Sequence, residues 1–460
     1  MKKLHFILAS SFIFTLLFYN EDLGLNWAIF GMIQTVLICY FFQEKFTTRL
    51  HLILVVASVL SCFAFAWYGD FSSFFAMALS IIFLQFKTHK PKLKMLQALP
   101  LALINGIASL GRILMFSQYL PKRKVNNDFA KKLIAYFVIP ILFLGLFLIV
   151  YSFGGDHFSS LFAGYYLDID VWQAFVITAL GFFISFTFWN YWIPEICYEK
   201  NDVLDSDFKQ EAKTQNHNSF SFLDIDFERR SGEITLFLLN ILLLVFITTY
   251  NYEQFFEVVE KSNLSSDTLE RVTAVVFSII MAICVILFYF KGGFNFDVKA
   301  QNLKKLAKIW IFLNGILILS AIIKNSEYVS YFGLTYKRLG VCAFLILAIV
   351  GLVIAFFKII NQKTNAYLFN QMIWYFYGTV LLCSFLNWGN LITNYNITVN
   401  KGVDPIFLSR LNFNDEVRRE YFLQNNLDGQ YIELSREKEI SRYQSESFLS
   451  KALYYETLNR

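Results

Sequence analysis

The polar residues best placed for chemistry are three asparagines near the end of the last long apolar segment. Asn387, Asn390 and Asn394 are spaced so that on one helix they would share a face. Trp374 and Tyr377 precede them by about three helical turns. Facing the interior of a helix bundle, this row could line a path for a polar, uncharged ligand. The alternative is that the amides hydrogen-bond neighbouring helices.

A second polar group precedes the apolar segment at 339–359. Gly333 allows a sharp bend, and Thr335 can cap the helix that follows. Lys337 and Arg338 could clamp a lipid phosphate, because basic side chains bind phosphate oxygens well. The alternative is that both long side chains extend to the headgroup region of the bilayer.

A third polar group closes the apolar segment at 171–194. Trp192 suits the boundary between hydrocarbon and water, so the stretch around it can be an interfacial anchor. The functional alternative places Asn190 and Glu195 in a pocket that faces the cytoplasm.

The rest of the sequence carries little catalytic chemistry. None of the five histidines pairs with another at metal-ligand spacing, the six cysteines show no C-x-x-C, and no nucleotide-binding or hydrolase motif is present. The sequence therefore predicts neither a metal site nor a cofactor. The middles of the apolar segments contain no Asp, Glu, Lys or Arg, which counts against ion-coupled transport. The clustered candidates for a membrane enzyme acting on lipid-linked sugars are Asp156, His157, Asp168 and Asp170.

The elements that must position these residues are long apolar segments. The chain has 460 residues, of which 56% are hydrophobic and 16% are charged, whereas soluble proteins carry about 25% charged residues. Segments of roughly 17–25 apolar residues can cross a bilayer core, and their backbone must then be helical. The sequence predicts an all-α, polytopic transmembrane helix bundle with about 11 spans, at 4–19, 25–42, 51–68, 71–86, 133–153, 171–194, 234–250, 272–290, 306–323, 339–359 and 368–392.

The lysines predict the orientation. Residues 87–94 contain four lysines, which favours the cytoplasmic side and places the N-terminus inside and the C-terminus outside. Residues 87–132 form a basic cytoplasmic segment, in which 95–116 is expected to be an interfacial or re-entrant helix between two basic clusters. We therefore divide the chain into four parts. Residues 1–86 form a four-span segment, and residues 87–132 form this basic segment. Residues 133–392 form a seven-span core with a cytoplasmic loop at 195–233, and residues 393–460 form a charged helical tail outside the cell membrane.

Two short stretches resemble a known family. Residues 331–338 read Y-F-G-L-T-Y-K-R, similar to a Y-G-L-T-x-x-R pattern with Phe332 in place of the tyrosine, and residues 392–397 read I-T-N-Y-N-I, with Asp404 and Leu408-Ser409 after them. Together they resemble the multi-pass bacterial membrane proteins grouped as domains of unknown function 4153 and 4173. The likeness is best from Ile234 onward, and the closing stretch departs from the family's Y-L-L-x-L-S. The resemblance implies an integral membrane protein and no established catalytic residues.

These observations favour a non-enzymatic scaffold, sensor or assembly component of the bacterial inner membrane. Its expected partners are the lipid bilayer and, through the tail, another envelope protein. Nucleic acid is not an expected partner, since the net charge of +5 is concentrated in a few loops. One alternative is an uncoupled transporter or lipid-handling protein, in which the last-span asparagines, Arg338 and Trp192 line a path. A second alternative is a membrane enzyme acting on lipid-linked substrates.

Overall fold

The protein is an assembly of helices that stand side by side. The computed structural model describes residues 3–46, 48–90, 92–115, 170–210, 224–256, 264–400, 404–427 and 429–458, with five single positions between 136 and 147. Every long regular element among these residues is an α-helix. The all-α prediction is therefore confirmed for this part of the chain.

The described helices differ in length between the two parts of the chain. Those up to residue 399 are mostly long and apolar, and those after it are short. They are α1 (Lys3–Phe18), α2 (Leu25–Phe41), α3 (Arg49–Tyr68), α4 (Phe71–His89), α5 (Ala98–Leu114), α9 (Val171–Trp189), α10 (Glu195–Glu199), α12 (Ile225–Phe256), α13 (Leu264–Tyr289), α14 (Gln301–Phe332), α15 (Tyr336–Ile360), α16 (Asn365–Ser384), α17 (Trp388–Val399), α18 (Pro405–Ser409), α19 (Asp415–Gln424), α20 (Gly429–Ser445) and α21 (Tyr454–Thr457).

Seven of these helices are long and apolar enough to cross a membrane, and α1, α2 and the apolar part of α13 are shorter apolar helices. The chain is thus a multi-span membrane protein. The count of 11 spans stays a prediction, and the expected span at 133–153 lies outside the described residues. Helix α5 is also among the seven, and its interfacial or re-entrant placement stays a prediction.

One expected element is wrong in detail. The apolar segment at 368–392 does not form one helix, because α16 ends at Ser384 and α17 begins at Trp388. The two helices are separated by Phe385, Leu386 and Asn387, and the Asn387 side chain accepts a hydrogen bond from the Asn390 amide (2.9 Å) as the N-cap of α17. Apolar composition alone does not predict such a break, since it carries no information on helix capping.

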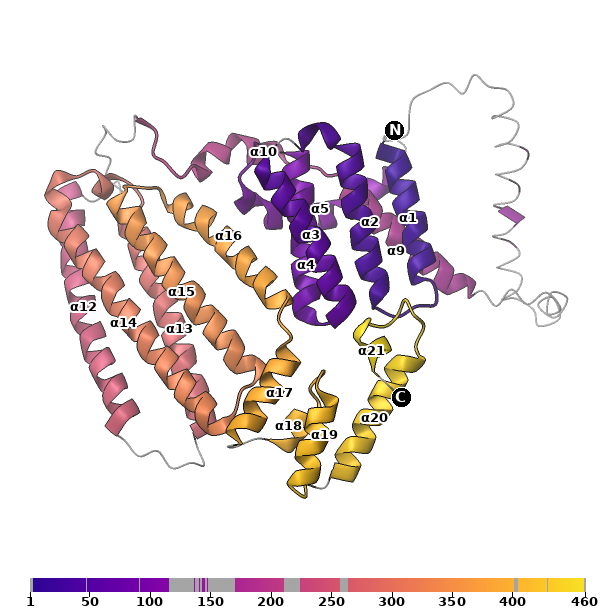
Figure 1. Ribbon diagram of the computed structural model, residues 1–460. Coiled ribbons are helices and arrows are strands. Elements are labelled where there is room, and N and C mark those ends of the chain that lie inside the picture. The colour runs from indigo at the N-terminus through magenta and orange to yellow at the C-terminus, as the bar shows by residue number, and fades with distance from the viewer. Residues whose placement is uncertain are drawn as a thin grey trace.

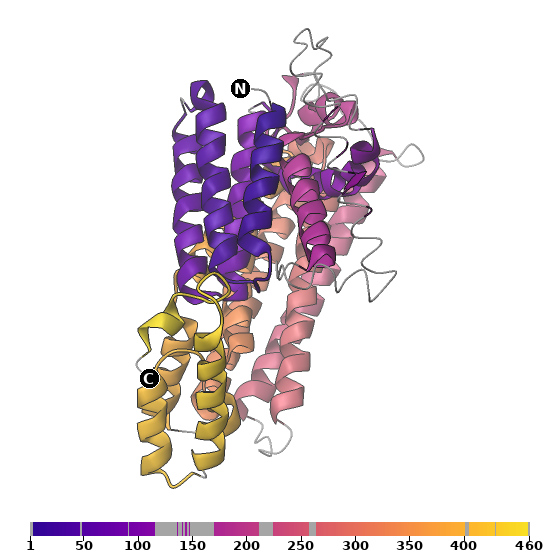
Figure 2. The same ribbon diagram turned by 90° about the vertical axis from the view of Figure 1, so that its right-hand side faces the viewer.

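The helices form two groups joined by α16 (Figure 1). Helices α1–α5 and α9 make an N-terminal group, and α12–α15 make a C-terminal group that stands beside it in Figures 1 and 2. Close packing inside the N-terminal group needs small residues, as where Gly181 on α9 faces the Phe14 ring on α1. Trp189 on α9 is fully buried, and its ring nitrogen donates to the Ser10 hydroxyl (3.0 Å).

Two polar segments connect the groups, one at each end of the bundle. At the end where the N-terminus lies, the loop after α10 binds the N-terminal group through the ion pair between Lys94 and Asp205 (2.6 Å). The same loop binds α16 through Asn370, whose amide donates to the Leu204 carbonyl (2.8 Å). We call residues 201–207 the upper strap. It belongs to the loop that the sequence predicted to be polar, at 195–233.

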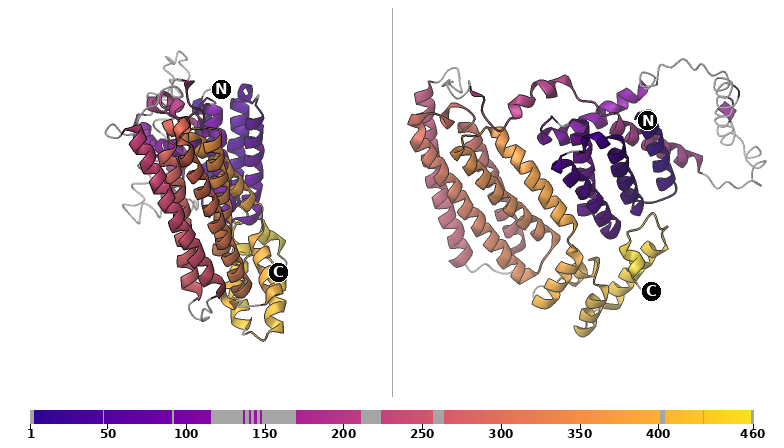
Figure 3. Two further views of the ribbon diagram at one scale, coloured as in Figure 1. Left: turned by 90° about the vertical axis from the view of Figure 1, so that its left-hand side faces the viewer. Right: turned by 45° about the horizontal axis from the view of Figure 1, so that its top comes forward.

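At the opposite end, the C-terminal tail lies below the N-terminal group and beside the lower end of the C-terminal group (Figures 1 and 3). The backbone amides of Leu25 and Asn26 donate to the carbonyls of Lys451 (3.1 Å) and Leu449 (3.0 Å). The Leu453 amide donates to the Ala66 carbonyl at the end of α3 (2.8 Å). We call residues 449–453 the lower strap, because they attach the tail to the N-terminal group.

The contact between Gly24 and the lower strap can be tested by one added methyl group. A Cβ at Gly24 would lie 2.3 Å from the Ser450 carbonyl carbon, so Gly24→Ala must displace the strap. Overpacking of this kind costs about 1–3 kcal/mol, which should speed tryptic cleavage after the buried Lys451 by roughly tenfold. Gly315→Ala is the matched control, since nothing lies within 4 Å of its Cβ position. Equal cleavage rates in the two variants would contradict the close packing.

Candidate functional site

The two stretches that carry the family resemblance meet in space, at the bend between α14 and α15. Gly333 adopts a left-handed φ of 75°, and a Cβ there would lie 2.7 Å from the Asn396 side-chain oxygen. Asn396 on α17 accepts from the Leu334 amide (2.5 Å) and donates to the Leu334 carbonyl (3.0 Å). One buried amide thus pairs with both backbone groups of a residue 62 positions away.

Arg338 secures the other side of the bend. Its guanidinium donates to the carbonyls of Phe332 (2.8 Å) and Gly333, and it lies 4.3 Å from the centre of the Tyr328 ring. These carbonyls end α14 and have no partner within that helix. The structure therefore directs Arg338 at protein carbonyls, whereas the neighbouring Lys337 is exposed. Thr335 caps α15 as the sequence predicted, with its hydroxyl accepting from the Arg338 amide (3.4 Å).

Two of the three predicted asparagines, Asn390 and Asn394, connect α17 to the tail, and Asn387 caps α17. They do not lie on the last apolar span, because Asn387 precedes α17 and the other two lie on it. The Asn394 amide donates to the Asn390 side-chain oxygen (2.6 Å), and Asn414 donates to both of them. Asn414 belongs to the tail, immediately before α19. The row therefore takes the hydrogen-bonding role that we gave as the alternative, with the tail as its partner.

Arg418 extends this network into the tail. It is 2% exposed, and its guanidinium donates to the Phe413 carbonyl and pairs with Asp415. The Tyr454 hydroxyl donates to the same Asp415 carboxylate (2.9 Å). Gly389 completes the contact, since no side chain could fit where the Asn412 carbonyl approaches it. We call this set of contacts, from Gly333 through Asn396 and Asn414 to Arg418, the bend–tail junction.

Trp374 and Tyr377 do not extend the asparagine row. Both lie on α16, where Tyr377 is buried and its hydroxyl donates to the Ser80 hydroxyl on α4 (2.9 Å). The Tyr377 ring lies 4.9 Å from the Phe83 ring, centre to centre. These contacts join α16 to the N-terminal group, and the break after α16 separates them from the asparagines.

The third predicted group, Asn190, Trp192 and Glu195, lies at the N-terminal end of the bundle. Its first two residues contact α5, since the Asn105 amide donates to the Trp192 carbonyl (2.7 Å) and the Arg112 guanidinium to the Asn190 carbonyl (2.7 Å). Glu195 is exposed at the start of α10. Burial raises the pKa of the neighbouring Tyr191 phenol, with a smaller contribution from Cys197.

Only one of the four candidates for an enzyme site lies in the described part of the chain. Asp156, His157 and Asp168 lie outside the described residues, and Asp170 caps α9 by accepting from the Trp172 and Gln173 amides. Within the described ranges, no three His, Cys, Asp or Glu side chains gather as a metal site would require. Sequence reasoning missed Asn396, Asn414 and Arg418 as functional positions. For Asn396 the signal existed, because it stands in the stretch that carries the resemblance.

These features define a class: a polytopic α-helical membrane protein with an ordered polar tail docked on its helix ends. The chain belongs to the family described as Domain of unknown function (DUF4153), whose sequence model matches residues 30–417. The match includes both sides of the bend and reaches into α19. It ends at residue 417, one residue before Arg418 of the bend–tail junction. Neither a curated protein nor a solved structure matches the chain.

Asn396→Ala tests the bend. The variant leaves the amide and carbonyl of Leu334 buried without a partner, which should lower the free energy of unfolding by about 2 kcal/mol. Thr398→Ala is the matched control on the same helix, and its exposed side chain should contribute less than about 0.5 kcal/mol. The measurement is reversible unfolding in mixed detergent micelles, followed by circular dichroism. A loss for Asn396→Ala no larger than the control would refute the assigned role.

Proposed function

We propose that this protein is a non-enzymatic scaffold or assembly component of the bacterial inner membrane, and that its C-terminal tail docks a second envelope protein. The single observation that carries the proposal is the attachment of the tail at two separate places. The bend–tail junction holds one part to α17, and the lower strap holds the other to α2 and α3.

The tail keeps apolar side chains on its outer surface after this docking. Leu423 at the end of α19 is 67% exposed, and Phe448 between α20 and the lower strap is 56% exposed. In a segment this rich in charge, exposed apolar residues on a rigid support are typical of a protein-binding surface. A rigid tail also lowers the entropic cost of binding a partner.

The predicted site residues support the same proposal. Arg338, Asn390 and Asn394 hydrogen-bond other parts of the protein in place of lining an open path. Their polar groups therefore stabilise the architecture, which favours a scaffold over an uncoupled transporter. The arrangement of lysines supports the orientation, because Lys87 and the lysines after it lie where α4 ends, at the end of the bundle opposite the tail (Figure 1).

Site-specific photo-crosslinking in living cells tests the docking surface. A photoreactive phenylalanine analogue at Leu423 or Phe448 should give one discrete protein adduct, while the same analogue at Leu52, exposed on α3, should give none. Leu423→Asp and Phe448→Asp should retain normal folded yield but fail to complement a deletion strain. Full complementation by both variants, without any protein adduct from the tail, would contradict the proposal.

The proposed orientation has its own test. Alkaline phosphatase fused after Arg460 should be active, since that enzyme forms its disulfides only outside the cytoplasm. A green fluorescent protein fused at the same point should stay dark, because it should be exported from the cytoplasm together with the tail. Bright fluorescence together with an inactive phosphatase would place the tail in the cytoplasm.

A further inference from the structure

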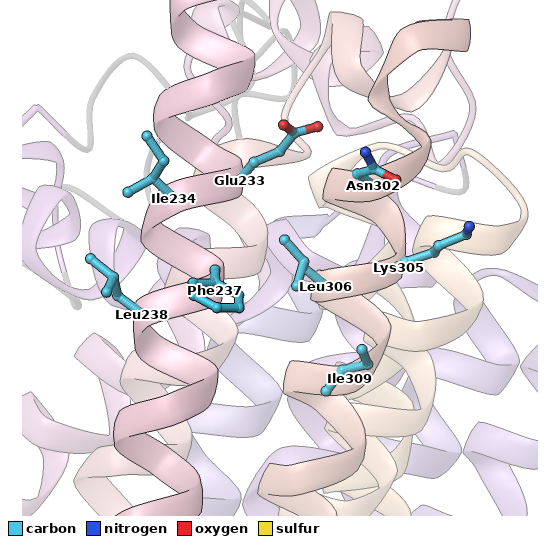
Figure 4. Close-up of a pocket in the computed structure, with 8 residues that line it drawn as sticks. All are labelled: Glu233, Ile234, Phe237, Leu238, Asn302, Lys305, Leu306 and Ile309. Carbon is cyan, nitrogen blue, oxygen red and sulfur yellow. The ribbon is translucent and has the colours of Figure 1, made fainter.

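A groove of about 550 Å³ opens on the outer face of the C-terminal group, between α12 and α14. Its volume lies within the usual range of small-molecule sites, about 300–1,000 Å³. Figure 4 shows that Phe237 and Leu306 lie between the two helices and that Ile309 lies further along α14. This part of the groove is apolar and faces the surroundings of the bundle.

Both walls change from charged to apolar along the groove. On α12 no charged residue follows Glu233 for about five turns. On α14 none follows Lys308 for about four turns. Beyond these positions both helices are mostly apolar, which suits them to hydrocarbon. The groove therefore crosses the level at which phospholipid headgroups give way to acyl chains.

The polar end of the groove offers groups of both signs. The Glu233 carboxylate on α12 points toward the Asn302 amide on α14, and Lys305 lines the same end from the outer side of α14 (Figure 4). Among the described residues neither Glu233 nor Lys305 has an ion-pair partner in the protein. Lysines 299, 304 and 308 lie close to Lys305 in sequence, so this end also attracts anions.

We propose that this groove binds one phospholipid with a primary-amine headgroup. The lipid ammonium donates hydrogen bonds to the Glu233 carboxylate, and the lipid phosphate accepts from the Asn302 amide and the Lys305 ammonium. One acyl chain lies along Phe237, Leu306 and Ile309. An acyl chain gains little binding free energy when it exchanges apolar lipid neighbours for apolar protein. The headgroup contacts therefore supply the selectivity. The carboxylate disfavours purely anionic headgroups, and a trimethylated ammonium cannot donate to it.

Native mass spectrometry of the full-length protein tests this site. The protein is released from nanodiscs that contain equal amounts of phosphatidylethanolamine, phosphatidylcholine and phosphatidylglycerol. Wild-type protein should retain phosphatidylethanolamine roughly tenfold better than the other two lipids. Glu233→Gln should reduce that preference to within about twofold, whereas Lys308→Gln, which lies outside the groove lining, should preserve it. Ile309→Trp should fill the groove and lower retention of all three lipids.

Three results would overturn the proposal. Wild-type protein that retains all three lipids equally, or favours phosphatidylglycerol, would show that the carboxylate does not select the headgroup. An unchanged preference in Glu233→Gln would place any bound lipid elsewhere. A dimer in the wild-type spectrum that Ile309→Trp converts to monomer would show that a second copy covers the groove. Each variant is first checked for a monodisperse gel-filtration peak, so that misfolded protein is not scored.

Discussion

Backbone groups released where a helix ends in the protein interior have no water to bond with, so the protein must supply their partners. The bend between α14 and α15 is the clearest case in this chain. Arg338 binds the carbonyls that end α14, and Asn396 binds both backbone groups of Leu334. Because Asn396 belongs to α17, its two hydrogen bonds tie the bend to α17. The position of α17 then fixes where the tail meets the bundle.

The same logic explains other polar side chains at the helix ends. Lys358 near the end of α15 is fully buried, and its ammonium donates to the Phe290 carbonyl just after α13 (2.6 Å). The Asn365 amide donates to the Leu287 carbonyl one turn earlier (2.9 Å). With the upper and lower straps, these contacts join segments that are distant in sequence. Both groups of helices are therefore held at their ends, while their flanks stay apolar, as at the groove between α12 and α14.

Helix content and most segment positions were predictable, because long apolar stretches have one low-energy form in a bilayer. The cap at Thr335 was predictable too, since capping is local. The break before Trp388 was missed, and with it the true position of the asparagine row. The partners of Asn396, Asn414 and Arg418 could not be predicted, because each pairs with residues that only the folded chain brings near. Residue spacing predicts a shared helix face but not what that face contacts.

The central claim is that the tail is a folded brace on both groups of helices. Hydrogen–deuterium exchange of residues 22–28 measures it most directly, because the Leu25 and Asn26 amides donate to the lower strap. In the full chain these two amides should exchange slowly, and a chain ending at Asn400 should exchange them at least tenfold faster. Helix α9, which makes none of these contacts, provides the internal reference. Equal exchange at Leu25 and Asn26 with and without the tail would contradict the account.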